Sequence, residues 1–299
     1  MKVGVVGIGI MGSSIARNLI ASGSAVIGFD VAPARCAELS EMGGDAAASA
    51  AEVAAHADII LTSLPSAAAL DETTAAILTR PRKSIVVVEL STLPIEVKLR
   101  SRDKLLAAGI AMLDCPLSGT GAQAVTRDLV VYASGDPTAY QRCAGIFPGF
   151  SRLTHYLGEF GNGSRMKFVA NLLVAIHNVA SAEAMVLGMK AGLDPDDIVK
   201  VIGSGAGTSR VFELRAPLMA AAEYGKPSMK IGIWQKDMAV IGEFATKLGV
   251  ATPLFAATAP IYNAAMGRGL SGDDTAAVCA VIEAMSGITR TGTRKEEAR

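Results

Sequence analysis

Short apolar runs alternate with segments of helical periodicity through the first half of the chain. The apolar runs have the length and composition of buried strands, and they cover residues 3–6, 24–30, 58–65, 85–90, 110–114 and 128–133. Between them, apolar residues recur at helical spacing over residues 13–20, 33–39, 51–55 and 95–108. Such alternation builds a parallel sheet with helices on both faces. We therefore predict a doubly wound α/β domain over residues 1–162, whose strand ends near residues 7, 30, 64, 91 and 115 meet at one crevice.

The pattern changes near residue 160. Residues 161–163 form a Gly-Asn-Gly break, and Ser164 is suited to cap the helix that follows. The next segment is rich in Ala, Leu, Met and Val and contains no proline, so we predict a long interdomain helix over residues 163–191. Asp194 and Pro195 mark another helix start. Later patterns are all helical, including residues 234–248 and 273–285, which predicts an all-α domain over residues 192–299.

The turn after the first predicted strand has the spacing G-x-G-x-x-G. Its residues are Gly7, Ile8, Gly9, Ile10, Met11 and Gly12. In the strand–turn–helix unit of a Rossmann fold, the first glycine allows a tight turn, and the second lets the backbone approach a pyrophosphate. The third lets helix and strand pack closely, so that the helix N-terminus faces the phosphates. The alternative is a glycine-rich turn without a ligand, but the flanking elements favour dinucleotide binding.

Asp30 ends the second predicted strand, roughly 20 residues after the glycine turn. A carboxylate at this place accepts hydrogen bonds from the adenosine ribose hydroxyls and repels a 2′-phosphate. No arginine stands directly beside it, although Arg35 is close in the sequence. Asp30 could instead simply cap the helix over residues 33–39. We predict NAD as the cofactor, with NADP as the alternative.

Composition and charge narrow the class of protein. The 299 residues are 51% hydrophobic, which is typical of a well-buried globular chain with room for two domains. Lys and Arg number 28, as do Asp and Glu, so no global field favours nucleic acid or an anionic membrane. We expect no signal peptide, membrane span or metal site, because apolar stretches look too short and the histidines lack partners at ligand spacing. The scattered cysteines suit a cytoplasmic protein.

Lys167 is the leading candidate for chemistry. Hydride exchange with an alcohol needs a proton donor and acceptor beside the cofactor, and groups that hold the substrate. Lys167 lies one turn into the interdomain helix, and Asn171 follows on the same helical face. An ammonium and an amide side by side could protonate an alkoxide and hold the substrate oxygen. The alternative is a solvated helix face.

Four blocks of the sequence resemble the β-hydroxyacid dehydrogenase family, which includes 3-hydroxyisobutyrate dehydrogenase, tartronate semialdehyde reductase and 6-phosphogluconate dehydrogenase-like enzymes. Residues 7–12, followed by Asn18-Leu19, resemble the family's opening G-x-G-x-M-G-x-x-x-x-x-N-L. Residues 114–120, Asp-Cys-Pro-Leu-Ser-Gly-Thr, resemble its substrate loop D-A-P-V-S-G-G. Residues 161–167 resemble its catalytic segment G-x-G-x-x-x-K, and Lys236-Asp237 resembles a K-D pair of its helical domain.

The resemblance implies a role for each of these segments. Lys167 would be the general acid/base, and Asn171 would orient the substrate. Ser118, Gly119 and Thr120 would hold the substrate carboxylate through hydroxyl and backbone N–H groups. Further implied contacts are Thr92 near the nicotinamide and substrate, Leu64 and Pro65 along the cofactor cleft, and Lys236 toward cofactor and substrate from the second domain. A protonated lysine would complement both an anionic acid and a developing alkoxide, and its pKa would have to be depressed.

Four positions depart from the family's pattern. Thr120 stands where many members have a second glycine, so the anion loop gains a side chain. Ala170 occupies a position often held by an asparagine, and Met229 one often held by an aromatic of the substrate pocket. Residues 127–128, Arg-Asp, replace a common Gly-Thr pair. These changes bear on the identity of the substrate and leave the chemistry intact.

The sequence therefore predicts an NAD-dependent oxidoreductase that transfers hydride between NAD(H) and a small 3-hydroxy acid similar to 3-hydroxyisobutyrate, or the corresponding semialdehyde. An imine reductase-like NAD(P)H enzyme is one alternative, although those enzymes generally lack a lysine at the place of Lys167. A non-catalytic nucleotide-binding or scaffold protein is the other. The expected partner is a small carboxylate-bearing substrate, with no nucleic acid and no membrane. The apolar helices of the second domain predict a homodimer or homotetramer.

Overall fold

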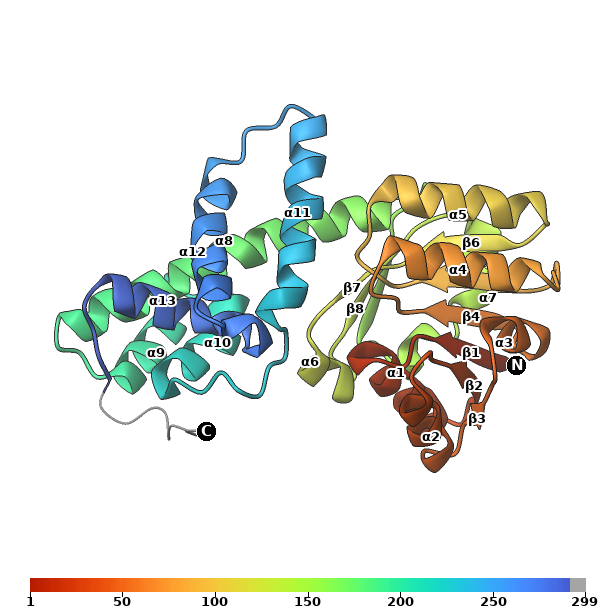
Figure 1. Cartoon of the computed structure of the whole chain (residues 1–299), viewed down its shortest axis with the longest axis horizontal. Helices are drawn as coiled ribbons and strands as arrows, with labels where there is room; N and C mark the ends of the chain where they lie inside the picture. The colour runs from red at the N-terminus through yellow and green to blue at the C-terminus, as the bar shows by residue number, and fades with distance from the viewer. Residues whose placement is uncertain (291–299) are drawn as a thin grey trace. The chain divides into compact units, whose positions relative to one another are not determined.

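The computed structural model of the chain describes residues 1–290 and divides the chain into two units, Met1–Phe168 and Val169–Arg299. The first unit is built on a six-stranded sheet of order β3-β2-β1-β4-β5-β6 (Figure 1). Its strands are β1 (Lys2–Val6), β2 (Ala25–Phe29), β3 (Asp45–Ala46), β4 (Ile59–Thr62), β5 (Val86–Glu89) and β6 (Ala111–Asp114). All neighbouring strands pair in parallel. The predicted doubly wound Rossmann sheet is therefore confirmed.

Helices cover both faces of this sheet, because side chains of each strand alternate between two apolar cores. Val3 and Leu61 point into one core, together with residues of α1, α6 and α7. Val6 and Ile60 point into the other, together with residues of α3, α4 and α5. The helices of this unit are α1 (Ile10–Ala21), α2 (Pro33–Glu41), α3 (Ala50–His56), α4 (Ala67–Leu78), α5 (Ile95–Ala107), α6 (Gly121–Val125) and α7 (Pro137–Cys143), with the short turn η1 (Phe147–Gly149).

A second sheet, of order β7-β8-β9, completes the first unit. Its strands are β7 (Leu117–Ser118), β8 (Val130–Ala133) and β9 (Leu153–Tyr156). The prediction that residues 128–133 continue the large parallel sheet is wrong, because β8 pairs antiparallel with β7 and parallel with β9. A parallel partner of β6 would need a crossover of about a dozen residues that returns over the sheet. Here β7 continues in line with the end of β6, and the chain reverses only after Ser118, through α6, so β8 runs antiparallel to both.

The second unit is built from helices, as predicted. They are α9 (Pro195–Gly203), α10 (Arg210–Ala221), α11 (Ile231–Lys247), α12 (Pro253–Gly267) and α13 (Val278–Met285), with the turns η2 (Leu270–Gly272) and η3 (Thr275–Ala277). Asp194 caps α9 as predicted, since its carboxylate accepts the N–H groups of Asp196 and Asp197. The last part of the predicted domain, residues 291–299, lies outside the described residues.

Helix α8 (Asn162–Lys190) has 29 residues and begins in the first unit. The prediction that Ser164 caps this helix is wrong: Ser164 lies within the first turn, and its hydroxyl donates to Asp114. Contrary to our interpretation of the sequence, α8 is long and apolar enough to cross a membrane by length and composition. The core helix of a globular protein passes the same test. The buried amides of Asn171 and Asn178 donate to Asp237 and Tyr262, as expected of a helix packed within a protein.

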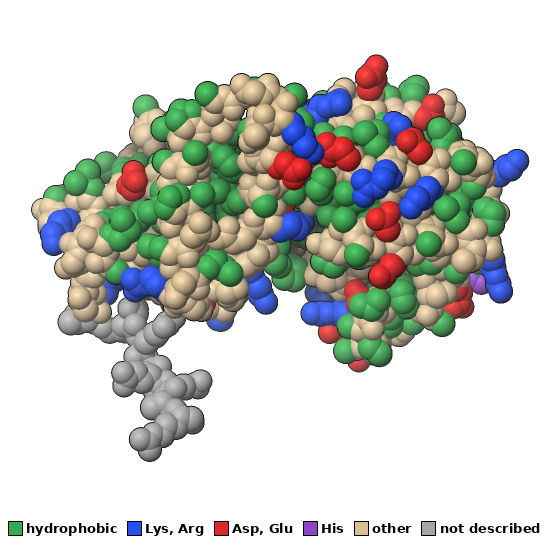
Figure 2. Space-filling model, turned by 45° about the horizontal axis from the view of Figure 1, so that its top comes forward, with side chains coloured by type: hydrophobic (Ala, Val, Ile, Leu, Met, Phe, Trp, Pro, Cys, Tyr) green, Lys and Arg blue, Asp and Glu red, His purple; other side chains and the backbone are tan. Residues whose placement is uncertain are grey.

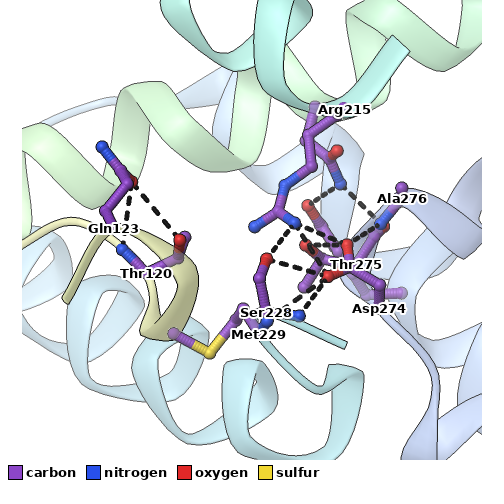
Figure 3. Close-up of polar contacts among 10 residues, drawn as sticks. Thr120, Gln123, Arg215, Ser228, Met229, Asp274, Thr275 and Ala276 are labelled. Atoms are coloured by element: carbon purple, nitrogen blue, oxygen red, sulfur yellow. Dashed lines mark hydrogen bonds and ion pairs between the residues drawn. The ribbon is translucent and has the colours of Figure 1, made fainter. Parts of the chain in front are cut away.

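A buried ion pair organises part of the second unit (Figure 3). The Nη1 atom of Arg215 lies 2.6 and 2.8 Å from the two carboxylate oxygens of Asp274. The same carboxylate accepts the backbone N–H groups of Ser228, Met229 and Ala276. Asp274 therefore joins α10, the segment before α11 and the turn η3. It also fixes the backbone of Met229, one of the positions at which the sequence departs from the family pattern.

Charged side chains of both signs are interspersed on the face shown in Figure 2, in keeping with 28 basic and 28 acidic residues. Several form exposed ion pairs, such as Lys2–Asp45 at 2.6 Å and Lys247–Glu243 at 2.9 Å. Exposed pairs of this kind contribute about 0.2–1 kcal/mol each. The charged surface therefore contributes little to the stability of the fold and creates no large region of one sign on this face.

Candidate active site

The turn between β1 and α1 explains each of its three glycines. Gly7 has a φ of +89°, and a Cβ there would lie 2.2 Å from the carbonyl oxygen of Ser63. A Cβ on Gly12 would lie 1.9 Å from the carbonyl oxygen of Gly7. Gly9 differs, because a Cβ there would meet no described atom within 4 Å. The structure of the chain thus requires Gly7 and Gly12, whereas Gly9 leaves open space in front of the backbone, as a bound pyrophosphate needs.

The N-terminus of α1 supports the same conclusion. The preceding residue, Gly9, provides no side-chain cap, and the first turn of α1 contains no acidic residue. A helix N-terminus without a carboxylate of its own is suited to an external anion. The residues present therefore fit a dinucleotide, with its pyrophosphate at Gly9 and at the start of α1.

Asp30 follows β2 and braces this turn. Its Oδ2 accepts the N–H of Ile8 at 2.7 Å, and its Oδ1 accepts the N–H of Ala32 at 2.9 Å. Helix α2 begins at Pro33 after Ala32, so Asp30 does not cap it directly. Arg35 is paired with Glu38, with an Nη1–Oε2 distance of 2.8 Å. Asp30 therefore lies beside the glycine turn, and the nearest arginine in sequence is engaged by a carboxylate of its own helix.

The loops after β4 and β5 are joined to each other. These loops carry Leu64 and Pro65, and Thr92, respectively. The N–H of Leu64 donates to the hydroxyl of Ser91 at 2.8 Å, and the N–H of Ser91 donates to Glu89 at 2.9 Å. Because β1 and β4 are neighbours at the point where the strand order reverses, these loops border the edge at which open α/β sheets bind ligands.

The predicted substrate loop, residues 118–120, links β7 to α6. Gly119 has a φ of +132°, and a Cβ there would lie 2.6 Å from Leu129. Thr120 precedes α6, and its backbone N–H and hydroxyl lie 3.1 and 3.4 Å from Oε1 of Gln123 (Figure 3). The additional side chain of Thr120 is thus turned toward Gln123. A substrate carboxylate would compete with that amide oxygen for the donors of Thr120.

Two polar residues that the resemblance left without a role hold this loop in place. Asn18 of α1 is buried, and its amide donates to the carbonyl oxygen of Ala124 in α6 at 2.7 Å. Asp128 accepts the amide of Gln123 and the guanidinium of Arg152. Arg127 adopts a φ of +60°, a conformation that favours glycine, in agreement with the glycine of the family pattern that Arg127 replaces. Asn18 therefore ties α1, the helix after the glycine turn, to α6, which follows the predicted substrate loop.

Lys167 lies on α8 and is 7% exposed. The chain enters this helix through Gly161, whose φ is +96°, and Gly163. A Cβ on Gly163 would lie 2.2 Å from the carbonyl oxygen of Tyr132 and 2.7 Å from that of Asp114. The start of α8 therefore packs directly against the backbone of β6 and β8. This close contact accounts for the second glycine of the segment.

Asn171 follows Lys167 by one helical turn and is 4% exposed. Its amide donates to Oδ2 of Asp237 at 3.0 Å. Lys236 lies 3.4 Å from Oδ1 of the same carboxylate and is half-buried. The sequence alone gives Asp237 no role beyond its place in the K-D pair. In the structure it fixes the amide of Asn171 and pairs with Lys236, so three polar residues of the second unit form one cluster.

Two buried cysteines near the candidate site are unsuited to nucleophilic catalysis. Burial and the neighbouring Asp114 raise the pKa of the Cys115 thiol well above its usual range, and burial raises that of Cys143 to about 12. A thiol attacks as its thiolate, so these side chains are inert at neutral pH. Within residues 1–290, no three His, Cys, Asp or Glu side chains are grouped so that they could hold a metal ion.

Comparison with known proteins gives matches along nearly the whole described chain. The family described as the NAD binding domain of 6-phosphogluconate dehydrogenase matches residues 2–158. The family described as NAD-binding of NADP-dependent 3-hydroxyisobutyrate dehydrogenase matches residues 161–282. Both matches agree with the division into a Rossmann unit and a helical unit.

Individual relatives agree with these families. L-threonate dehydrogenase of Cupriavidus necator is 31% identical over 94% of this chain and 96% of its own. 2-(Hydroxymethyl)glutarate dehydrogenase of Eubacterium barkeri is 29% identical over 98% of both chains. The crystal structure of 3-hydroxyisobutyrate dehydrogenase from Salmonella typhimurium superimposes with a TM-score of 0.84 at 29% identity, over 94% of this chain and 99% of that chain. The protein therefore belongs to the β-hydroxyacid dehydrogenase family and is a nicotinamide-dependent oxidoreductase.

Proposed function

We propose that the protein transfers hydride between NAD(H) and a small 3-hydroxy acid similar to 3-hydroxyisobutyrate, or the corresponding semialdehyde. The observation that carries this proposal is the position of Lys167 on α8. This buried lysine lies one turn after Gly163, and the start of its helix packs against the backbone that leads into residues 118–120. Lys167 is thus carried by a helix whose start packs beside the segment that leads into the loop matching the family's substrate-binding segment.

Lys167 acts as the general acid and base. In the oxidation its neutral amine accepts the hydroxyl proton of the substrate, and in the reduction its ammonium returns that proton to the alkoxide oxygen. The nicotinamide, when bound, supplies the hydride acceptor or donor. Asn171, with its amide fixed by Asp237, orients the substrate oxygen.

The substrate carboxylate is held by Ser118, Gly119 and Thr120. Backbone N–H groups around a glycine with positive φ form a concave anion site, to which hydroxyl groups add donors. Lys236 is the other substrate contact that we propose, and within the helical unit its ion pair with Asp237 keeps it beside Asn171. Thr92, Leu64 and Pro65 line the cofactor site through the two joined loops.

NAD is the preferred cofactor. The carboxylate of Asp30 braces the glycine turn through Ile8 and is available to the ribose hydroxyls of a bound dinucleotide. A 2′-phosphate at the same place would face that negative charge, and Arg35 is paired with Glu38. These contacts support discrimination against NADP.

The protein acts in the cytoplasm as a homodimer or homotetramer. All four cysteines are free thiols, as is usual in a reducing compartment. Several large apolar side chains of α8 are exposed, among them Val169, Leu173 and Leu187, and one copy of the chain leaves them uncovered. A monomeric mass by light scattering would contradict the assembly.

A substrate panel tests the proposal. Short 3-hydroxy acids are assayed with NAD and NADP, and their semialdehydes and a cyclic imine with NADH and NADPH. We expect turnover of at least one hydroxy acid, faster with NAD. Lys167→Ala should lower kcat by about 10²–10⁴-fold and retain NADH binding, whereas Lys200→Ala, an exposed lysine of α9, should change neither. Turnover of the imine alone would indicate an imine reductase, and nucleotide binding without turnover a binding protein.

A further inference from the structure

A buried charged cluster lies beneath the loops of the candidate site. It consists of Lys98 on α5, Glu89 at the end of β5 and Asp114 at the end of β6, and all three side chains are fully buried. The ammonium of Lys98 lies 2.5 Å from Oε2 of Glu89 and 2.8 Å from Oδ1 of Asp114. Burial alone would lower the pKa of Lys98, but the attraction of both carboxylates outweighs it and raises this pKa to about 12. Lys98 is therefore a permanent cation shared by two strand ends.

One end of this cluster reaches the cofactor side of the site. Glu89 accepts the N–H of Ser91 at 2.9 Å, and the hydroxyl of Ser91 accepts the N–H of Leu64 at 2.8 Å. Thr92 follows Ser91 directly. The carboxylate of Glu89 thus fixes the loop after β5 and, through it, the loop after β4.

The other end reaches the start of α8. Oδ2 of Asp114 accepts the N–H of Ser164 at 2.8 Å, and Oδ1 accepts its hydroxyl at 2.8 Å. Nearby, the N–H of Gly163 donates to the hydroxyl of Ser134 at 3.0 Å. The cluster contains two carboxylates and one cation, and the positive end of the helix dipole meets the excess negative charge. Asp114 is also the residue from which the chain continues into β7 and the substrate loop.

These contacts form an uninterrupted path from Leu64 through Ser91, Glu89, Lys98 and Asp114 to Ser164. A buried ion pair is weak support for stability, because apolar side chains of similar volume commonly serve as well. Apolar side chains could not accept the N–H groups of Ser91 and Ser164, however, and would leave the loops and the helix start unattached. The polar cluster is suited to positioning the loops and the helix start.

We propose that Glu89, Lys98 and Asp114 are positioning residues of the reaction, and that the two bonds between Asp114 and Ser164 set the place of Lys167 relative to the substrate loop. This inference rests on the proposed function of Lys167. Lys167 lies one helical turn beyond Ser164, so a looser first turn moves its amine directly. A displacement of about 1 Å in a reacting group lowers turnover by up to about a hundredfold.

Ser164→Ala tests the inference, because it removes the hydroxyl bond and keeps the ion pairs of Lys98. Ser101→Ala is the matched control: Ser101 is also a fully buried serine, it lies on α5, and its hydroxyl has no hydrogen-bond partner among the described residues. The two variants and the wild type are compared by kcat per NADH-binding site, by KM, and by amide hydrogen exchange of a peptide that covers residues 160–168. Counting NADH-binding sites removes any loss that comes from unfolded protein.

We expect Ser164→Ala to lower kcat per site by about tenfold to a hundredfold, with the dissociation constant of NADH within twofold of the wild type. Exchange in residues 160–168 should accelerate, whereas Ser101→Ala should leave kcat and exchange unchanged. Asp114→Asn should show a larger loss if it folds. If hydrogen exchange in Ser164→Ala is unchanged, Asp114 does not fix the first turn of α8 through Ser164. If exchange is faster but kcat is unchanged, this contact does not position Lys167 for the reaction. If the wild type turns over no substrate of the panel, the proposed function fails, and the exchange measurement still decides whether Asp114 anchors α8.

Discussion

Replacing Gly163 by alanine should displace the start of α8 and slow the reaction. The added Cβ would lie 2.2 Å from the carbonyl oxygen of Tyr132, 2.7 Å from that of Asp114 and 3.0 Å from Cδ of Pro116. Ordinary non-bonded contact begins near 3.5 Å, so the nearest pair must separate by about 1 Å. Two of the three obstacles are backbone atoms of the sheet region and cannot rotate away. The first turn of α8 must therefore move, and Lys167 moves with it.

The expected kinetic effect is large, and the expected thermodynamic effect is small. A shift of about 1 Å lowers kcat by up to about a hundredfold. Overpacking lowers the free energy of unfolding by about 1–3 kcal/mol, whereas alanine in place of a helical glycine raises it by about 1 kcal/mol. The melting temperature should therefore fall by only a few degrees. NADH binding should persist, since the glycine turn of residues 7–12 is unchanged.

A matched substitution separates displacement from the ordinary effect of alanine. Gly203 is also a helical glycine, at the end of α9, and a Cβ there meets no described atom within 4 Å. Gly203→Ala should keep kcat unchanged and stabilise the protein slightly. Initial rates with the best hydroxy acid, NADH fluorescence titration and thermal denaturation give the three quantities. If Gly163→Ala keeps kcat within threefold of the wild type, the placement of Lys167 by this contact is refuted.

Three other substitutions test separate parts of the argument. Asp30→Asn removes a negative charge that would repel a 2′-phosphate by about 1–2 kcal/mol. The ratio of kcat/KM with NAD to kcat/KM with NADP should therefore fall by roughly tenfold, and an unchanged ratio would contradict the role of Asp30 in selecting NAD. Arg127→Gly relieves a positive φ of 60° and should raise the free energy of unfolding by about 0.5–1 kcal/mol, whereas Thr126→Gly, at a φ of −94°, should lower it. Asp274→Asn leaves the buried Arg215 without its ion partner and should lower the free energy of unfolding by about 3–5 kcal/mol. Unfolding can be followed by the fluorescence of Trp234, the single tryptophan of the chain, and a loss below about 1 kcal/mol would contradict a stabilising role of the ion pair.

The sequence predicted those parts of the protein that depend on residues close together in the chain. The glycine turn, the strands on either side of it and the cap at Asp194 follow from local spacing and backbone preference. The prediction for β8 failed because an apolar run shows that a strand is buried and does not show which sheet it joins. Pairing of β8 with β7 depends on the reversal of the chain after Ser118, through α6, which no periodicity records.

The polar residues that position the site were the least predictable, and Asp114 illustrates why. An aspartate at the end of an apolar strand is ordinarily interpreted as the point where the strand reaches solvent, and Lys98 in an amphipathic helix as part of its exposed face. Both side chains are 0% exposed, because α5 and the start of α8 close over the end of β6. Each charged side chain can be buried there only because the oppositely charged partners are buried beside it. No single residue in the sequence therefore predicts the cluster. The same reasoning applies to Asp237, which follows Lys236 in the sequence. Its carboxylate pairs with Lys236 and accepts the amide of Asn171, a contact between α11 and α8 that the sequence does not show. Local motifs thus predict which groups contact cofactor and substrate, while the residues that fix the geometry of those groups become visible only through contacts between segments far apart in the chain.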